Sequence, residues 1–199
     1  MENQVRARMI RGAAQLLARR GLEGTSFSSV VELTGAPRGS LYHHFPGGKT
    51  ELIAAAIELV LSHALEQLGR KAGASAVEIA EDYLDIWGGV LTRSRCKVGC
   101  SLAAVVVAAD SPDLIDRAGA AFRVWRSRLA ELLVAGGLSN QDAETVSVML
   151  LAASEGAVIL ARAERTLRPF EIVREQLIDR VRAATLKPAA ESVDPRQGD

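Results

Sequence analysis

The sequence is poor in cysteine, histidine and aromatic residues: its 199 residues include two cysteines, three histidines and 4% aromatic side chains. Two cysteines cannot build the disulfide framework of a small secreted domain. The longest apolar run, Leu102 to Ala109, is too short to cross a bilayer, and the first residues lack the apolar stretch of a secretory signal. We therefore expect a cytoplasmic protein with no membrane partner, and its 48% apolar residues are ample for a packed core.

The formal net charge is zero, but the charges are unevenly distributed. Residues 1–50 carry seven basic and three acidic side chains, a balance of +4, whereas residues 51–199 hold 17 basic and 21 acidic groups, a balance of −4. A basic N-terminal quarter on an acidic body is typical of a module that binds a polyanion and is joined to a part with a second function. Patchily charged helical surfaces are also common, so this pattern alone decides little.

Apolar residues recur at three- and four-residue intervals along most of the chain, and strand patterns with hairpin turns are missing. We therefore predict an all-α fold of about nine helices. Two short helices are expected over Phe27–Thr34 and Arg38–His44 after a first helix that stops at Gly21. A long helix over residues 49–71 and five segments near 75–93, 99–109, 112–135, 140–165 and 170–185 follow. The predicted parts are a three-helix unit (1–48), a helical bundle (49–186) and a disordered polar tail (187–199).

The two short helices and the glycine turn between them have the pattern of a helix-turn-helix, whose second helix can lie in the DNA major groove. Leu41 and Phe45 are four residues apart and are expected to face a core shared with Val30, Val31 and Leu33. The same spacing turns Arg38, Ser40, Tyr42 and His43 outward, and Gly39 allows a close approach of the backbone to DNA. Similar helix pairs occur in proteins that do not bind DNA, so from these residues alone both interpretations stay open.

The string Arg38-Gly39-Ser40-Leu41-Tyr42-His43-His44-Phe45, followed by Pro46-Gly47-Gly48-Lys49-Thr50-Glu51-Leu52, resembles the DNA-binding signature of the TetR family of bacterial repressors. Ala36-Pro37-Arg38-Gly39 together with Pro46-Gly47-Gly48-Lys49 is most similar to the LmrA/YxaF-like branch. Family members usually have serine or threonine where Pro37 stands, so that side-chain contact is absent here.

The resemblance implies that the first 48 residues form a DNA-binding domain and that the chain is a homodimer on a pseudo-palindromic operator. Tyr42 and Lys49 would contact phosphates, and Arg38 and His43 would contact base edges. The DNA-contacting positions implied by the family are Thr25, Ser26, Ser28, Arg38, Gly39, Ser40, Tyr42, His43 and Lys49.

The resemblance also implies that the C-terminal part binds a small apolar or aromatic inducer, after which the repressor leaves its operator. The branch suggests flavonoid-like or multidrug ligands. The long helix over residues 49–71 would join the pocket to the DNA-binding domain. Candidate pocket residues are Trp87, Cys100, Val106, Phe122, Trp125, Met149, Ala153 and Glu155, with Glu155 as a polar anchor. Each of them could equally be an ordinary core residue.

Other chemistry has little support in the sequence. His43 and His44 are adjacent on a helix and point roughly 100° apart, so they cannot chelate one metal ion. The serines lack a nucleophile elbow, and Gly47-Gly48-Lys49-Thr50 lacks P-loop spacing. We therefore expect no catalytic residue, no metal site and no cofactor.

Two features leave alternatives open. Cys96 and Cys100 could be a redox pair activated by nearby basic residues, or Cys100 could simply pack at the head of a helix. The many small residues of segment 140–165 suit either a dimer interface or close packing within one chain.

The alternative to a repressor is a helical small-molecule-binding or interaction protein without an operator.

Overall fold

The computed structural model describes residues 2–37, 39–70 and 73–186. These residues form helices and no strand, which confirms the predicted all-α fold. The predicted tail over residues 187–199 lies outside the described residues. The helices within them are α1 (Glu2–Arg20), α2 (Phe27–Thr34), α3 (Ser40–His44), α4 (Gly48–Gly69), α5 (Ala76–Ser94), α6 (Ser101–Ala108), α7 (Pro112–Ala135), α8 (Asn140–Glu164) and α9 (Arg168–Thr185).

Local sequence signals set the ends of the first helices. Gly21 stops α1 with a φ of +72°, and Gly35 stops α2 with a φ of +63°, a conformation that favours glycine. At the other end of α2, the Ser26 side chain accepts a hydrogen bond from the Ser29 amide. The third helix is shorter than predicted: it begins at Ser40, whose amide and hydroxyl both donate to the Pro37 carbonyl in a turn before the helix.

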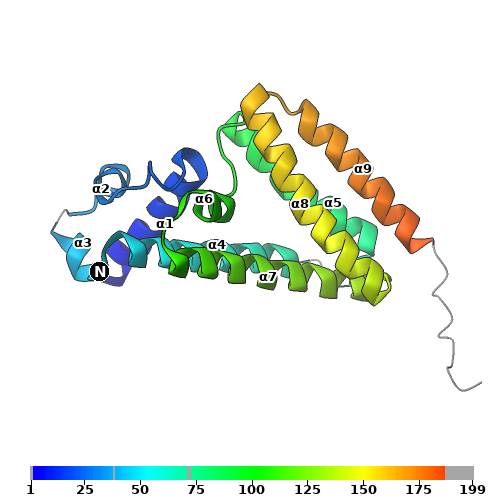
Figure 1. Ribbon diagram of the computed structural model, residues 1–199, viewed down its shortest axis with the longest axis horizontal. Helices are drawn as coiled ribbons and strands as arrows, with labels where there is room; N and C mark the ends of the chain where they lie inside the picture. Colours follow the sequence, from blue (N-terminus) through cyan, green and yellow to red (C-terminus); the bar gives the residue numbers. More distant parts are fainter. Residues whose placement is uncertain (1, 38, 71–72, 187–199) are drawn as a thin grey trace, which may run out of the picture.

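The long helices α4 and α7 run side by side along the length of the molecule (Figure 1). At one end α1 packs on α4, α2 and α6, and at the other end α5, α8 and α9 pack together. The first group contains the core predicted around α3, because Val30, Leu41 and Phe45 are at most 4% exposed. Leu33 was expected in this core but is 45% exposed, since it lies on the outer side of α2.

By length and composition alone, α4 and α8 could each cross a membrane. In the fold, α4 instead packs against α1 and α7, and α8 packs between α7 and α9. Helices of a packed bundle meet the same criterion. One side of α8 nevertheless stays apolar and exposed, and this side is described below.

Candidate nucleic-acid interface and ligand cavity

The helix α3 presents a polar surface because its apolar residues hold the opposite side in the core. Tyr42 and His43 are both exposed, Tyr42 to 71%. The Tyr42 ring packs edge-on against Phe27 of α2, with ring centroids 5.6 Å apart and an interplanar angle of 90°. This ring contact fixes α3 against α2 and leaves the phenol at the surface of the helix-turn-helix.

Gly39 precedes α3 at an exposed position where the fold itself does not require glycine. Its φ is −67°, an ordinary value, and a Cβ added there would meet no atom within 4 Å. The missing side chain therefore leaves open surface beside Tyr42. Its neighbour Arg38, the predicted base contact, lies outside the described residues.

The predicted backbone-contacting residues at the start of α2 have three different environments. Thr25 is buried, and its hydroxyl donates to the Gly21 carbonyl at 2.8 Å. Ser26 caps α2, whereas Ser28 is exposed, and its hydroxyl lies 2.8 Å from that of Ser26. Of the three, Ser28 is placed best to reach an external phosphate.

Lys49 makes a contact that the sequence did not suggest. Its Nζ donates to the Leu22 carbonyl at 2.9 Å, which joins the start of α4 to the loop between α1 and α2. A lysine ammonium has three hydrogens, so one bond to Leu22 leaves two donors for a phosphate. Its position at a helix N-terminus adds to the local positive potential.

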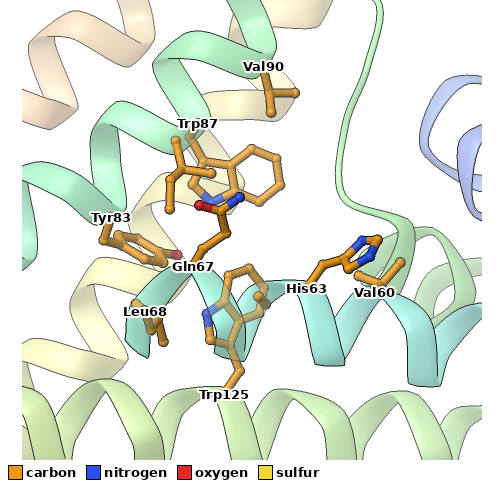
Figure 2. Close-up of a pocket in the computed structure, with 10 residues that line it drawn as sticks. Val60, His63, Gln67, Leu68, Tyr83, Trp87, Val90 and Trp125 are labelled. Carbon is orange, nitrogen blue, oxygen red and sulfur yellow. The ribbon is translucent and has the colours of Figure 1, made fainter. Parts of the chain in front are cut away.

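A cavity with a volume of about 260 Å³ lies among α4, α5 and α7. Trp87 and Trp125 are among its lining residues and were both predicted as pocket residues. Figure 2 shows their indole rings above and below the same space, with Tyr83 to one side. The full lining is Val60, His63, Ala64, Gln67, Leu68, Tyr83, Ile86, Trp87, Val90 and Trp125.

The contribution of α4 to this cavity was missed by the sequence analysis. Its lining residues, at positions 60, 63, 64, 67 and 68, form one helical stripe. This spacing was visible in the sequence, but the spacing does not show what the stripe faces. The same helix therefore begins beside the helix-turn-helix and ends at the cavity.

The other six predicted pocket residues are not among the residues that line this cavity. Val106 and Met149 are 40% and 37% exposed. Phe122 is half-buried and stacks on Trp125, with ring centroids 6.4 Å apart. The remaining three, all half-buried, are Cys100, Ala153 and Glu155.

A buried polar cluster adjoins the cavity. The Tyr83 and Ser154 hydroxyls are 2.9 Å apart, and Tyr83 also lies against Trp125 at a centroid distance of 6.0 Å. Burial raises the pKa of the Tyr83 hydroxyl, and burial raises the pKa of Glu155 to about 6. Three atoms are buried without a hydrogen-bond partner among the described residues: Trp87 Nε1, Trp125 Nε1 and Glu155 Oε1.

Replacing Glu155 by glutamine tests this burial. Burial raises the pKa of Glu155 in the folded protein from 4.5 to about 6. The folded state therefore resists ionisation of this carboxyl, and the free energy of unfolding of the wild type falls as pH rises from about 4.5 through 6. We expect the free energy of unfolding of Glu155→Gln, relative to wild type, to rise by about 1–2 kcal/mol between about pH 4.5 and pH 7. Urea unfolding at several pH values measures this difference, and a difference independent of pH would contradict it.

Cys96 and Cys100 are both free thiols. Cys100 caps α6, where its sulfur accepts the Ala103 amide at 3.5 Å. Burial, followed by the nearby Glu155 charge, raises the pKa of the Cys100 thiol well above its ordinary value. This environment favours packing over redox chemistry at Cys100, because the thiolate is the reactive form.

Residues at the start of α6 are bonded to α1, in the same part of the molecule as the helix-turn-helix. The Gly99 amide donates to the Ala18 carbonyl at 2.8 Å, and the Ser101 hydroxyl donates to the Ala14 carbonyl at 3.2 Å. Both acceptors belong to α1. Because the loop over residues 95–100 follows α5, these bonds link the end of α5 to α1, beside the connection through α4.

The small residues of α8 divide between two sides of the helix. Ala143, Ser154, Ala157 and Ala161 are buried within the chain. On the outer side, small and apolar residues recur at three- and four-residue intervals and are all exposed. They are Met149, Ala152, Gly156, Ile159 and Ala163. We call these five residues the α8 outer stripe.

Comparisons with known proteins agree with this geometry. Residues 9–56 match the family of bacterial regulatory proteins described as the tetR family, and residues 76–176 match the C-terminal domain described as transcriptional regulator LmrA/YxaF-like. An uncharacterised HTH-type transcriptional regulator of Mycobacterium tuberculosis is 35% identical over 86% of this chain and 91% of its own length. The HTH-type transcriptional regulator LmrA of Bacillus subtilis is 28% identical over 83% of this chain and 90% of its own length.

Solved structures show the same arrangement. A TetR family transcriptional regulator from Cytophaga hutchinsonii has a TM-score of 0.77 and 25% identity, and the match covers 94% of this chain and 98% of that one. The regulatory protein TetR from Rhodobacter sphaeroides also has a TM-score of 0.77, with 19% identity over 87% and 97% of the two chains. The sequence matches extend over most of the chain, and the helix-turn-helix lies where they place it. The protein therefore belongs to the TetR family of bacterial transcriptional regulators, in its LmrA/YxaF-like branch.

Proposed function

We propose that the protein is a cytoplasmic, ligand-responsive repressor that binds a palindromic operator as a homodimer and leaves it when a small molecule enters the cavity. The observation that carries the DNA-binding part is the open surface at Gly39 beside the exposed Tyr42. A glycine that the fold does not need leaves room for something outside the chain to approach, and the Tyr42 phenol on α3 and the Lys49 ammonium at the start of α4 suit phosphates.

The proposed DNA contacts are arranged around α3. Tyr42, Ser28 and Lys49 would hold the phosphate backbone, while Arg38 and His43 would reach base edges. Thr25 and Ser26 would act indirectly, because their hydroxyls already hold the start of α2 in place. Ser40 would act similarly through its bond to Pro37. We assign DNA binding to residues 1–48, with Lys49 at the boundary, and ligand binding and dimerisation to residues 49–186.

Gly39→Ala separates this proposal from a structural role for Gly39. Because the added Cβ meets no atom of the chain and the backbone φ is ordinary, we expect the free energy of unfolding to change by less than about 1 kcal/mol. We expect operator affinity to fall by about tenfold or more, since the methyl group would separate the backbone from the sugar-phosphate chain. Fluorescence anisotropy with a labelled duplex measures the affinity. Unchanged affinity would contradict the assigned surface.

The α8 outer stripe supports the homodimer. Regulators of this family form dimers, and here an unpartnered, apolar, small-residue surface lies on a long helix that packs beside α9. Small side chains let two helices approach closely, as in a four-helix interface made from two copies of α8 and α9. A dimer presents two copies of α3 to the two halves of a palindromic site.

Two connections support transmission from the cavity to the DNA. The helix α4 lines the cavity and begins at Gly48, beside Lys49. The helix α6 does not line the cavity, but it packs on α7, which carries Trp125, and its start is bonded to α1. A ligand shifts the equilibrium only by its differential affinity for two conformers, and a change from 1:99 to 99:1 needs about 5.5 kcal/mol. We therefore propose that α4 and α6 move α1 and α3 together.

The test of ligand response uses the complex with a labelled operator duplex. Both tryptophans of the chain line the cavity, so intrinsic tryptophan fluorescence reports ligand binding there. In a panel of small aromatic compounds, we expect those that change tryptophan fluorescence to include at least one that lowers the anisotropy of the duplex. Compounds that occupy the cavity without any release of DNA would contradict the proposed response.

The alternative is a helical binding or interaction protein without an operator. This alternative predicts that substitutions at Gly39 and Lys49 leave the binding of its small molecule or partner unchanged.

A further inference from the structure

We propose that the cavity selects a neutral, ring-shaped molecule carrying a hydrogen-bond acceptor oxygen, such as a ketone, ester or quinone, and that the indole N–H of Trp125 donates to this oxygen. This inference rests on the proposed function, in which a small molecule binds in the cavity, and adds the chemistry that recognises it. Trp125 would be a specificity-determining residue.

The lining of the cavity favours a neutral ligand. None of the ten described lining residues is lysine, arginine, aspartate or glutamate. A cationic ligand would meet no carboxylate there, and an anionic ligand would meet only the exposed His63 imidazole, so burial of a charged group is unfavourable. The lining polar groups His63 and Gln67 are exposed, and the Tyr83 hydroxyl is already bonded to Ser154.

The unpaired indole N–H groups favour an acceptor on that ligand. Trp87 and Trp125 are only 7% and 8% exposed, and their ring nitrogens have no hydrogen-bond partner among the described residues. Native proteins rarely keep a buried donor unpaired, and an indole nitrogen can only donate. The Trp87 indole lies close enough to Tyr83 to lower the pKa of its hydroxyl. Among the described residues, the Trp125 N–H has no such link to a hydroxyl, so it is the donor in greater need of an acceptor.

Trp125 Nε1 is buried, so in the proposed complex the Trp125 ring turns to bring its N–H to the acceptor. Figure 2 shows this ring rising from α7 into the lined space. A ligand with an acceptor would therefore favour a conformer that differs from the one that the structure shows at Trp125. This preference is the differential affinity that release from DNA requires.

The size of the cavity suits a ring system. Its volume of about 260 Å³ exceeds the roughly 150 Å³ at which an apolar cavity in another protein already holds benzene. A bicyclic molecule is therefore a reasonable probe. Tetralin and 1-tetralone share one bicyclic skeleton, and the ketone differs by a carbonyl in place of one methylene group.

The test measures the dissociation constants of both probes by calorimetry, with the full-length wild type, Trp125→Phe and Trp87→Phe. Because each probe is compared across the proteins, differences in the solubility of the two probes cancel. We expect Trp125→Phe to weaken 1-tetralone binding about tenfold, as for one lost hydrogen bond, and tetralin binding less than about twofold. Trp87→Phe makes the same change of ring at the same cavity. We expect it to reduce the preference for 1-tetralone over tetralin less than Trp125→Phe does.

A second readout uses the indole N–H signals in a ¹H–¹⁵N spectrum. The chain has two tryptophans, so two such signals report on the cavity, and the variants assign them. We expect 1-tetralone, and not tetralin, to move the Trp125 signal downfield.

The inference would be overturned by any of three results. Trp125→Phe could change the dissociation constants of both probes equally, 1-tetralone could leave the Trp125 signal unmoved, or neither probe could bind. Operator release is measured separately. Binding of 1-tetralone through Trp125 without release would contradict the proposed ligand response alone. Release by tetralin and 1-tetralone alike, with no effect of Trp125→Phe, would contradict this inference alone.

Discussion

Ile159→Asp is expected to convert the protein to a monomer and to lower operator affinity by about 100-fold or more, because one α3 then holds one half-site. Ile159 is 62% exposed in the single chain, so a folded protomer tolerates aspartate there. In a dimer packed through the α8 outer stripe, the same carboxylate would be buried without a partner, at a cost of about 3–5 kcal/mol. Sedimentation equilibrium and duplex anisotropy on one preparation measure both effects.

Val107→Asp is the matched control for this change. Val107 is an 86% exposed apolar residue on α6, so the substitution introduces the same charge away from the α8 outer stripe. We expect Val107→Asp to sediment as a dimer, like the wild type, and to bind the operator with the affinity of the wild type. If Ile159→Asp remained dimeric, or if both variants became monomeric, the proposed interface would be wrong.

Lys49→Ala is expected to weaken binding to operator and to scrambled DNA by a similar factor, about tenfold at low salt. The reason is that a phosphate contact contributes to affinity on any sequence. The slope of log affinity against log salt is expected to become smaller by roughly one unit. Removal of the bond to the Leu22 carbonyl should also lower the free energy of unfolding by about 1 kcal/mol.

Lys49→Arg distinguishes the charge from the shape of this side chain. It keeps a positive group at the start of α4, so we expect the salt slope of the wild type. A thermal melt of both variants separates loss of the fold from loss of the contact. A wild-type salt slope in Lys49→Ala would mean that Lys49 serves only to hold the loop at Leu22.

Much of the fold could be predicted because local signals set the ends of the helices. Ser26 and Gly35 mark the two ends of α2. The 3.6-residue period of apolar side chains identified the long helices. The helix-turn-helix could also be located, because the spacing of Leu41 and Phe45 fixes which residues of α3 face outward. These signals depend on near neighbours in the chain.

The cavity could be predicted only in part, because its shape depends on contacts between distant segments. Trp87 and Trp125 were proposed because the resemblance to the family implies a ligand cavity lined by their segments, but the stripe on α4 has the spacing of any packed helix. The bond between Lys49 and the Leu22 carbonyl joins residues 27 positions apart. The burial of Thr25 likewise depends on how α1 and α2 pack, which the short pattern around it does not specify.

The central claim, that the protein reads a specific DNA sequence as a dimer, is tested most directly by selecting duplexes from a random pool with the purified protein. Small molecules are first extracted, because a bound ligand would hold the protein off DNA. The account predicts a palindromic consensus that binds about 10³-fold or more tightly than scrambled DNA at physiological salt. Failure to enrich any sequence over a full salt series, with ligand-free protein, would contradict it.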